Sequence, residues 1–108
     1  MKFSEYKYER PDLEQVQKHY ADYIDELKEA QDADKFMVVF NKLNQMRNHI
    51  TSMKTIASLR YTINTADEFY EKENDYWDEY SPFYQQLDTR LYKTIMESDL
   101  LEIGRAHV

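Results

Sequence analysis

The sequence predicts an all-α protein of three long antiparallel helices, at about residues 12–31, 34–64 and 66–97, preceded by an extended N-terminal arm. Two observations support this fold class. Gly104 is the only glycine and Pro11 and Pro82 are the only prolines, so little interrupts a helix between residues 12 and 101. Apolar residues also recur at spacings of three and four, the period of an amphipathic helix. With 42% hydrophobic residues, the 108-residue chain has enough apolar material for one core.

The arm is predicted over residues 1–11, because Phe3, Tyr6 and Tyr8 suggest an extended segment that packs aromatic rings onto a neighbour. A frayed terminus is the alternative. Asp12 is expected to cap the first helix. The apolar stripe of that helix consists of Leu13, Val16, Tyr20, Tyr23, Ile24 and Leu27.

The second helix is expected to begin with Asp32 or Asp34 as its cap and to carry apolar residues on two sides. Ile56, Leu59 and Ile63 form a second apolar group, roughly 180–240° round the helix from the main stripe. Two neighbouring helices do not supply cover for both sides, so we expect an incomplete lobe of a larger helical protein. The main stripe consists of Phe36, Val39, Leu43, Met46, Ile50, Met53 and Ala57.

The third helix is predicted to start from a capping box, in which the Thr65 hydroxyl and the Glu68 carboxylate each bind the other's backbone amide. Such a tight connection makes the second and third helices antiparallel neighbours. The phase of the aromatic face continues through Pro82, so we expect one helix kinked there. The alternative is a new helix with Ser81 as its cap.

The segment 102–108 breaks the helical period and resembles the translation of a widely used sequencing adapter. Our hypothesis is that these residues are a non-native tail, so that the native lobe covers residues 12–101. The nucleotide record tests it, since different codons would refute the idea.

Charge and composition exclude several classes of partner. With 14 basic and 21 acidic residues the formal net charge is −7, which argues against nucleic acid binding. No apolar run approaches the roughly 20 residues of a membrane span, so we expect no membrane partner. The chain has no cysteine, which fits a reducing compartment, and we expect a cytoplasmic protein.

No catalytic or metal-binding residue is predicted in this chain. His-Glu-x-x-His is absent, and His19 and His49 have the pattern of packing or hydrogen-bonding residues. A cluster of carboxylates is interpreted as a solvated helix face rather than a metal site, because metal-binding carboxylates normally converge from several elements. The cluster comprises Asp67, Glu68, Glu71, Glu73, Asp75, Asp78 and Glu79.

A strip of small polar residues on the second helix leaves two interpretations open. Small side chains allow a close helix approach, which we favour; alternatively, the strip lines a wet cleft where a peptide backbone can form hydrogen bonds. The strip consists of Asn44, Asn48, Thr51, Thr55, Ser58 and Thr62.

Several blocks in order resemble the N-terminus of M3-family zinc metallopeptidases of the oligoendopeptidase F type. They are KF and YKYERPD within residues 2–12, RNHI at 47–50, IASLRYTINT at 56–65, and DEFY and END within 67–75. The resemblance covers essentially everything up to about Leu101 and implies a nearly all-helical protein. It also implies a zinc site far downstream.

The resemblance implies that this chain is the N-terminal lobe of a zinc-dependent oligoendopeptidase that hydrolyses short peptides. The lobe would wall the substrate channel, with oligopeptides and the remaining C-terminal catalytic domain as partners. The chain would need no cofactor of its own, while the full-length parent would hold zinc, and the chain alone should be inactive. We expect Asn48, Thr51, Thr55 and Arg60 to line the channel. The alternative is a free-standing acidic helical bundle that acts as an interaction module.

Overall fold

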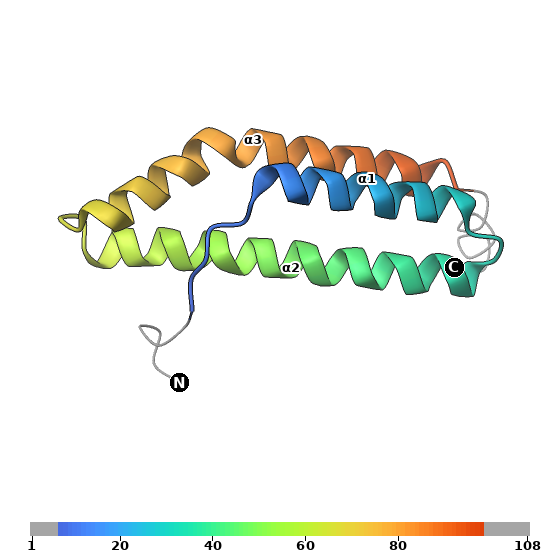
Figure 1. The fold of residues 1–108 in the computed structure, drawn as a ribbon, viewed down its shortest axis with the longest axis horizontal. Coiled ribbons are helices and arrows are strands. Elements are labelled where there is room, and N and C mark those ends of the chain that lie inside the picture. The colour runs from blue at the N-terminus through green and yellow to red at the C-terminus, as the bar shows by residue number, and fades with distance from the viewer. Residues whose placement is uncertain (1–6, 99–108) are drawn as a thin grey trace.

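A computed structural model describes residues 7–98 as three helices: α1 (Leu13–Glu29), α2 (Ala33–Ile63) and α3 (Glu68–Met96). No strand occurs within that range. The predicted fold class is confirmed, and each predicted helix end lies within two residues of the observed one. Figure 1 shows α2 running antiparallel to α1 and α3. Phe3, Tyr6 and the expected tail at 102–108 lie outside the described residues.

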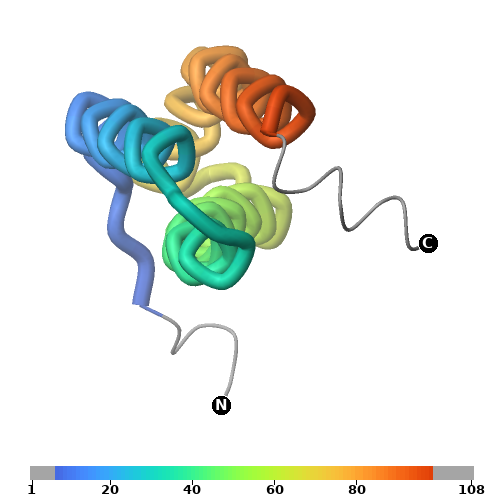
Figure 2. The backbone as a smooth tube through the Cα atoms, turned by 90° about the vertical axis from the view of Figure 1, so that its right-hand side faces the viewer, coloured from blue at the N-terminus to red at the C-terminus, as the bar shows by residue number. Residues whose placement is uncertain are grey.

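The three helices pack in a triangle, as Figure 2 shows in end view, and each contacts the other two. Because α1 has 17 residues and α2 has 31, α1 cannot accompany α2 along its whole length. The arm (residues 7–12 of the described chain) continues past the second half of α2 instead (Figure 1). There the Glu9 amide donates to Met53 Sδ at 3.5 Å.

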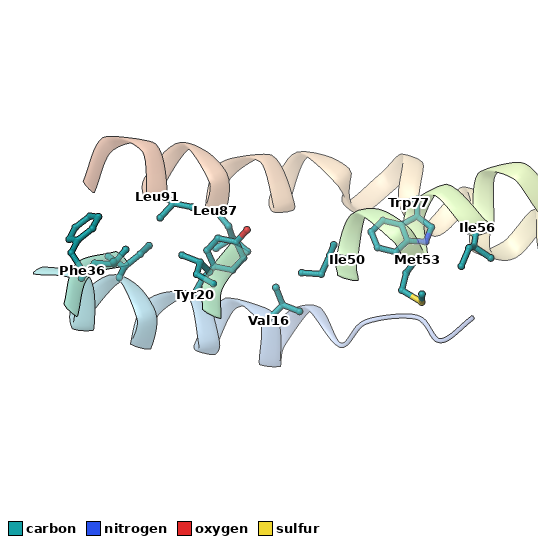
Figure 3. Packing of buried hydrophobic residues seen from close by; sticks show 13 residues of the cluster. Val16, Tyr20, Phe36, Ile50, Met53, Ile56, Trp77, Leu87 and Leu91 are labelled. Atoms are coloured by element: carbon teal, nitrogen blue, oxygen red, sulfur yellow. The ribbon is translucent and has the colours of Figure 1, made fainter. Parts of the chain in front are cut away.

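The core lies between the three helices and is built from the predicted stripes. In Figure 3, Val16 and Tyr20 from α1 point towards the same interior as Leu87 and Leu91 from α3. Leu43 and Leu91 are fully buried. The buried apolar residues are Val16, Tyr20, Ile24, Leu27, Phe36, Leu43, Ile50, Met53, Ile56, Ala57, Trp77, Leu87 and Leu91.

Aspartates cap all three helices. The Asp12 carboxylate accepts the amides of Glu14 and Gln15, and the Asp32 carboxylate accepts the amide of Lys35, so Asp32 rather than Asp34 caps α2. These bonds satisfy amides that have no partner within the helix.

The predicted capping box at Thr65 is wrong. Asp67 is the cap of α3, and its carboxylate accepts the Tyr70 amide at 3.1 Å. Asn64 organises the preceding turn, because its side-chain oxygen accepts the Ala66 amide and its backbone carbonyl accepts the Asp67 amide. The helix therefore begins at Glu68, two residues later than predicted.

Pro82 lies inside α3, so the single helix is confirmed and a new start at Ser81 is excluded. Proline has no amide hydrogen to donate to the carbonyl one turn earlier. The neighbouring Ser81 hydroxyl donates to the Trp77 carbonyl. Figure 1 shows α3 changing direction near its middle, as expected of a helix that contains proline.

The second apolar group of α2 is divided between core and surface. Leu59 and Ile63 are 43% and 75% exposed, as expected of a side without cover. Ile56 is only 7% exposed, so the expectation that all three lack cover is wrong for this residue. The arm passes this half of α2 (Figure 1), and its Tyr8 packs against the core cluster that includes Ile56.

Candidate functional site

A pocket of about 180 Å³ lies between α2 and α3, with Tyr20 from α1 among its lining residues. Its buried lining is apolar and aromatic, including Ile50 and Trp77. Its remaining lining is mostly polar and comes from successive turns of the two long helices. These polar residues are Asn44, Arg47, Asn48, Thr51, Lys54, Ser81, Gln85 and Asp88.

An ion pair between Arg47 and Asp88 forms part of this pocket. Arg47 Nε donates to Asp88 Oδ1 at 2.9 Å, and the Tyr20 hydroxyl donates to the same oxygen at 2.6 Å. Arg47 Nη2 also donates to the Tyr92 hydroxyl at 2.7 Å. Burial raises the pKa of Tyr20, and the bond to Asp88 raises it further, so this phenol stays neutral. The network ties together all three helices.

A second polar cluster, the Glu73 clasp, consists of Glu73 with Tyr8, Arg10 and Trp77. The Tyr8 hydroxyl donates to Glu73 Oε1 at 2.6 Å, and Arg10 donates to both carboxylate oxygens at 3.0 and 2.5 Å. Trp77 Nε1 donates to the Tyr8 hydroxyl at 3.1 Å. The clasp therefore fastens the arm to α3 across more than 60 residues of sequence.

The hydrogen-bond partners of Glu73 stabilise its negative charge. Burial alone would raise the pKa of Glu73, but hydrogen bonds from Arg10 and Tyr8 outweigh it and hold the pKa below its usual value. Burial raises the pKa of Tyr8, and the hydrogen bond that Tyr8 donates to Glu73 acts in the same direction. The cluster is thus an anionic carboxylate between a cation and a neutral phenol.

Sequence reasoning missed this cluster. Glu73 was grouped with the solvated carboxylates, yet it is only 5% exposed. The signal that could have identified it is its position four residues before Trp77, on the aromatic face of α3. Among residues 7–98, no group of three histidine or carboxylate side chains is placed to hold a metal ion. His19 and His49 are both exposed.

The four expected channel residues do not share one location. Asn48 and Thr51 line the pocket between α2 and α3, whereas Thr55, one turn beyond Thr51 on the same face, is exposed and is not part of the lining. Arg60 lies roughly half a turn round the helix from Thr51. Its guanidinium carbon is 5.9 Å from the ring centroids of both Tyr8 and Tyr70.

Within residues 7–98, the polar strip of α2 does not form the close helix contact that we favour from the sequence. Asn44 is half-buried, and the five members from Asn48 to Thr62 are exposed. A helix packed closely on these small side chains would bury them. Their exposure, together with the pocket at Asn48 and Thr51, fits the alternative of a wet cleft.

Comparison with known proteins gives one family. The family model for the peptidase M3 N-terminal domain matches residues 3–103. No curated protein matches the chain.

Three solved structures match almost the whole chain. One is described as PZ peptidase A with an inhibitor (31% identity, TM-score 0.92), and another as an oligoendopeptidase F (34% identity, TM-score 0.92). The chain covers 19% of each, with 98% of its own residues aligned. A third, an oligoendopeptidase F from Bacillus anthracis str. Ames, is 28% identical with a TM-score of 0.94, and the alignment covers 99% of this chain and 20% of that one. The chain thus spans about one fifth of the solved chains it matches.

Proposed function

The chain belongs to the peptidase M3 N-terminal domain family, and from this we propose that the whole protein is a zinc-dependent oligoendopeptidase that hydrolyses short peptides. The observation that carries the proposal is the family match over residues 3–103. The agreement in both sequence and fold with solved peptidases supports it. In this proposal the present chain is the lobe that walls the substrate channel and excludes folded proteins.

The described residues do not fit a zinc site, since they bring together no set of three metal-binding side chains. In our proposal, zinc and its ligands belong to the rest of the longer protein. Zinc supplies a Lewis acid and an activated water when it is bound in such a peptidase. In the same proposal, the present chain binds and orients the peptide.

The wall that we propose is the face of α2 that carries Asn48, Thr51 and Thr55. Their amide and hydroxyl groups are exposed, and each can both donate and accept, as a peptide backbone requires. Arg60 lies on another side of α2 beside Tyr8 and Tyr70, so we assign it to the arm contact rather than to the channel.

We also propose that Leu59 and Ile63 pack against the catalytic part of the longer protein. Both are exposed on one face of α2, and together they offer an apolar surface that burial would stabilise. The remaining four fifths of the solved related chains provide the kind of partner that this surface needs. For the compartment we propose the cytoplasm, because the sequence has no cysteine. No helix in the described range is long and apolar enough to cross a membrane.

The test is to express the longer protein from the gene that encodes this chain and to assay it with short quenched fluorescent peptides. We expect hydrolysis that a zinc chelator abolishes and added zinc restores, while the 108-residue chain alone is inactive. Absence of hydrolysis by the zinc-loaded longer protein would contradict the proposal. A reading frame that closes after Val108 in the genome would favour the free-standing interaction module.

A further inference from the structure

Three charged side chains line the pocket between α2 and α3, namely Arg47, Lys54 and Asp88. Arg47 and Asp88 neutralise each other, and Tyr20 and Tyr92 complete their hydrogen bonds. Lys54 also lines the pocket, is exposed, and has no ion pair or hydrogen bond with any residue in the described range. The lining therefore carries a net charge of about +1, although the whole chain carries −7.

The size of the pocket limits what can occupy it. At about 180 Å³ it is smaller than the roughly 300–1,000 Å³ of pockets that enclose a whole small molecule. It has room for a charged group and the peptide unit next to it. The side chains of Asn48 and Gln85 stand on opposite helices and supply uncharged donors and acceptors for that unit.

We propose that the α2–α3 pocket binds a carboxylate of a short peptide through Lys54. This inference rests on the proposed function and names the substrate feature that the channel wall selects. A carboxylate is the peptide group that complements a lone ammonium, and it is borne either by the C-terminus or by an acidic side chain. An amine or guanidinium would meet Lys54 as a like charge.

The test uses the zinc-loaded longer protein and three versions of one acidic peptide: the free acid, the C-terminal amide, and the free acid with its acidic side chain replaced by the matching amide. We expect kcat/KM to fall about two- to fivefold for the version that loses the recognised carboxylate, the range expected of an exposed ion pair. Which version loses activity identifies the source of the carboxylate.

Lys54→Gln should remove that discrimination by lowering kcat/KM for the preferred peptide alone. Lys18→Gln, an exposed lysine on α1 outside the pocket, is the matched control and should retain it. Equal cleavage of all three peptides by the unaltered protein, or discrimination that survives Lys54→Gln, would overturn the inference and leave the peptidase function standing. Absence of hydrolysis of every version would overturn the function itself, and the inference with it.

Discussion

Glu73 shows how a single side chain can hold together parts of the chain that are far apart in sequence. An unpaired carboxylate in this position would be strongly unfavourable, because burial removes it from water. Arg10 and Tyr8 compensate with three hydrogen bonds, and the Arg10 guanidinium also lies 4.3 Å from the centre of the Tyr76 ring. The contact holds the arm on the part of α2 that α1 is too short to cover.

Glu73→Gln is expected to lower the free energy of unfolding by about 2 kcal/mol, because it removes the charge that strengthens three hydrogen bonds. The Arg10 side chain is 45% exposed, so water screens part of the ion pair and we do not expect a larger effect. Urea unfolding followed by circular dichroism measures the change. Glu71 is an exposed carboxylate on the same helix, so Glu71→Gln should change the free energy of unfolding by less than about 0.5 kcal/mol. Equal loss of stability in the two variants would contradict a stabilising role for the Glu73 clasp.

The same residue gives a pH prediction with a definite sign. The pKa of Glu73 is lower in the folded protein than its ordinary value, so its ionisation stabilises the fold above that ordinary value, about 4.3. That stabilisation is lost as the pH falls through the folded pKa. The stability difference between the unaltered chain and Glu73→Gln should therefore shrink on acidification, as urea unfolding at pH 7 and at pH 3 would measure. A stability difference that is the same at both pH values would contradict the proposed stabilisation by ionised Glu73.

At the scale of the helix, Thr65 and Asp67 are both candidates for the cap of α3, and the structure has Asp67 in that role. Asp67→Ala should lower stability by about 1 kcal/mol, because it leaves the Tyr70 amide without its partner. Thr65→Ala should change it by less than about 0.5 kcal/mol, since Thr65 is exposed and lies in the turn. Thermal or urea unfolding of both variants measures this. The reverse order would restore the capping box that we predicted from sequence.

The helices were predictable because their signal is local. The apolar period persists over each helix, and the aromatic phase through Pro82 distinguished one helix from two. The choice between Thr65 and Asp67 was not predictable, since both fit the preferences of a cap. It depends on the turn that Asn64 organises, a geometry that the residue types alone do not determine.

The candidate site was predictable only where it follows the period of one helix. Asn48 and Thr51 were placed on one face by their spacing, and both line the pocket. The ion pair of Arg47 with Asp88 joins residues 41 positions apart, and the burial of Ile56 accompanies contacts that the arm makes more than 40 residues away. Such pairings belong to the packing of helices against each other, which no local pattern reports.

At the scale of the whole molecule, the chain behaves as one part of a larger fold. Its three helices enclose a core, yet Leu59 and Ile63 remain on the surface of α2. The related solved chains are about five times longer, so they contain further elements that can cover such a surface. Leu59 follows Thr55 by one turn of the same helix, so the proposed docking surface adjoins the proposed peptide-binding residues.

The isolated 108-residue chain should therefore be helical and still bind a hydrophobic dye and self-associate, because its exposed apolar surface lacks its proposed partner. Replacing Leu59 and Ile63 together by glutamine should reduce dye fluorescence and shift the chain towards monomer in sedimentation velocity, without loss of helical circular dichroism. Val38→Gln is the matched control, since Val38 is an exposed apolar residue near the start of the same helix, 55% exposed. If Val38→Gln has the same effect, the dye reports general exposure rather than one docking surface. An unaltered chain that is a dye-silent monomer with sharp unfolding would contradict the proposal that Leu59 and Ile63 await a partner.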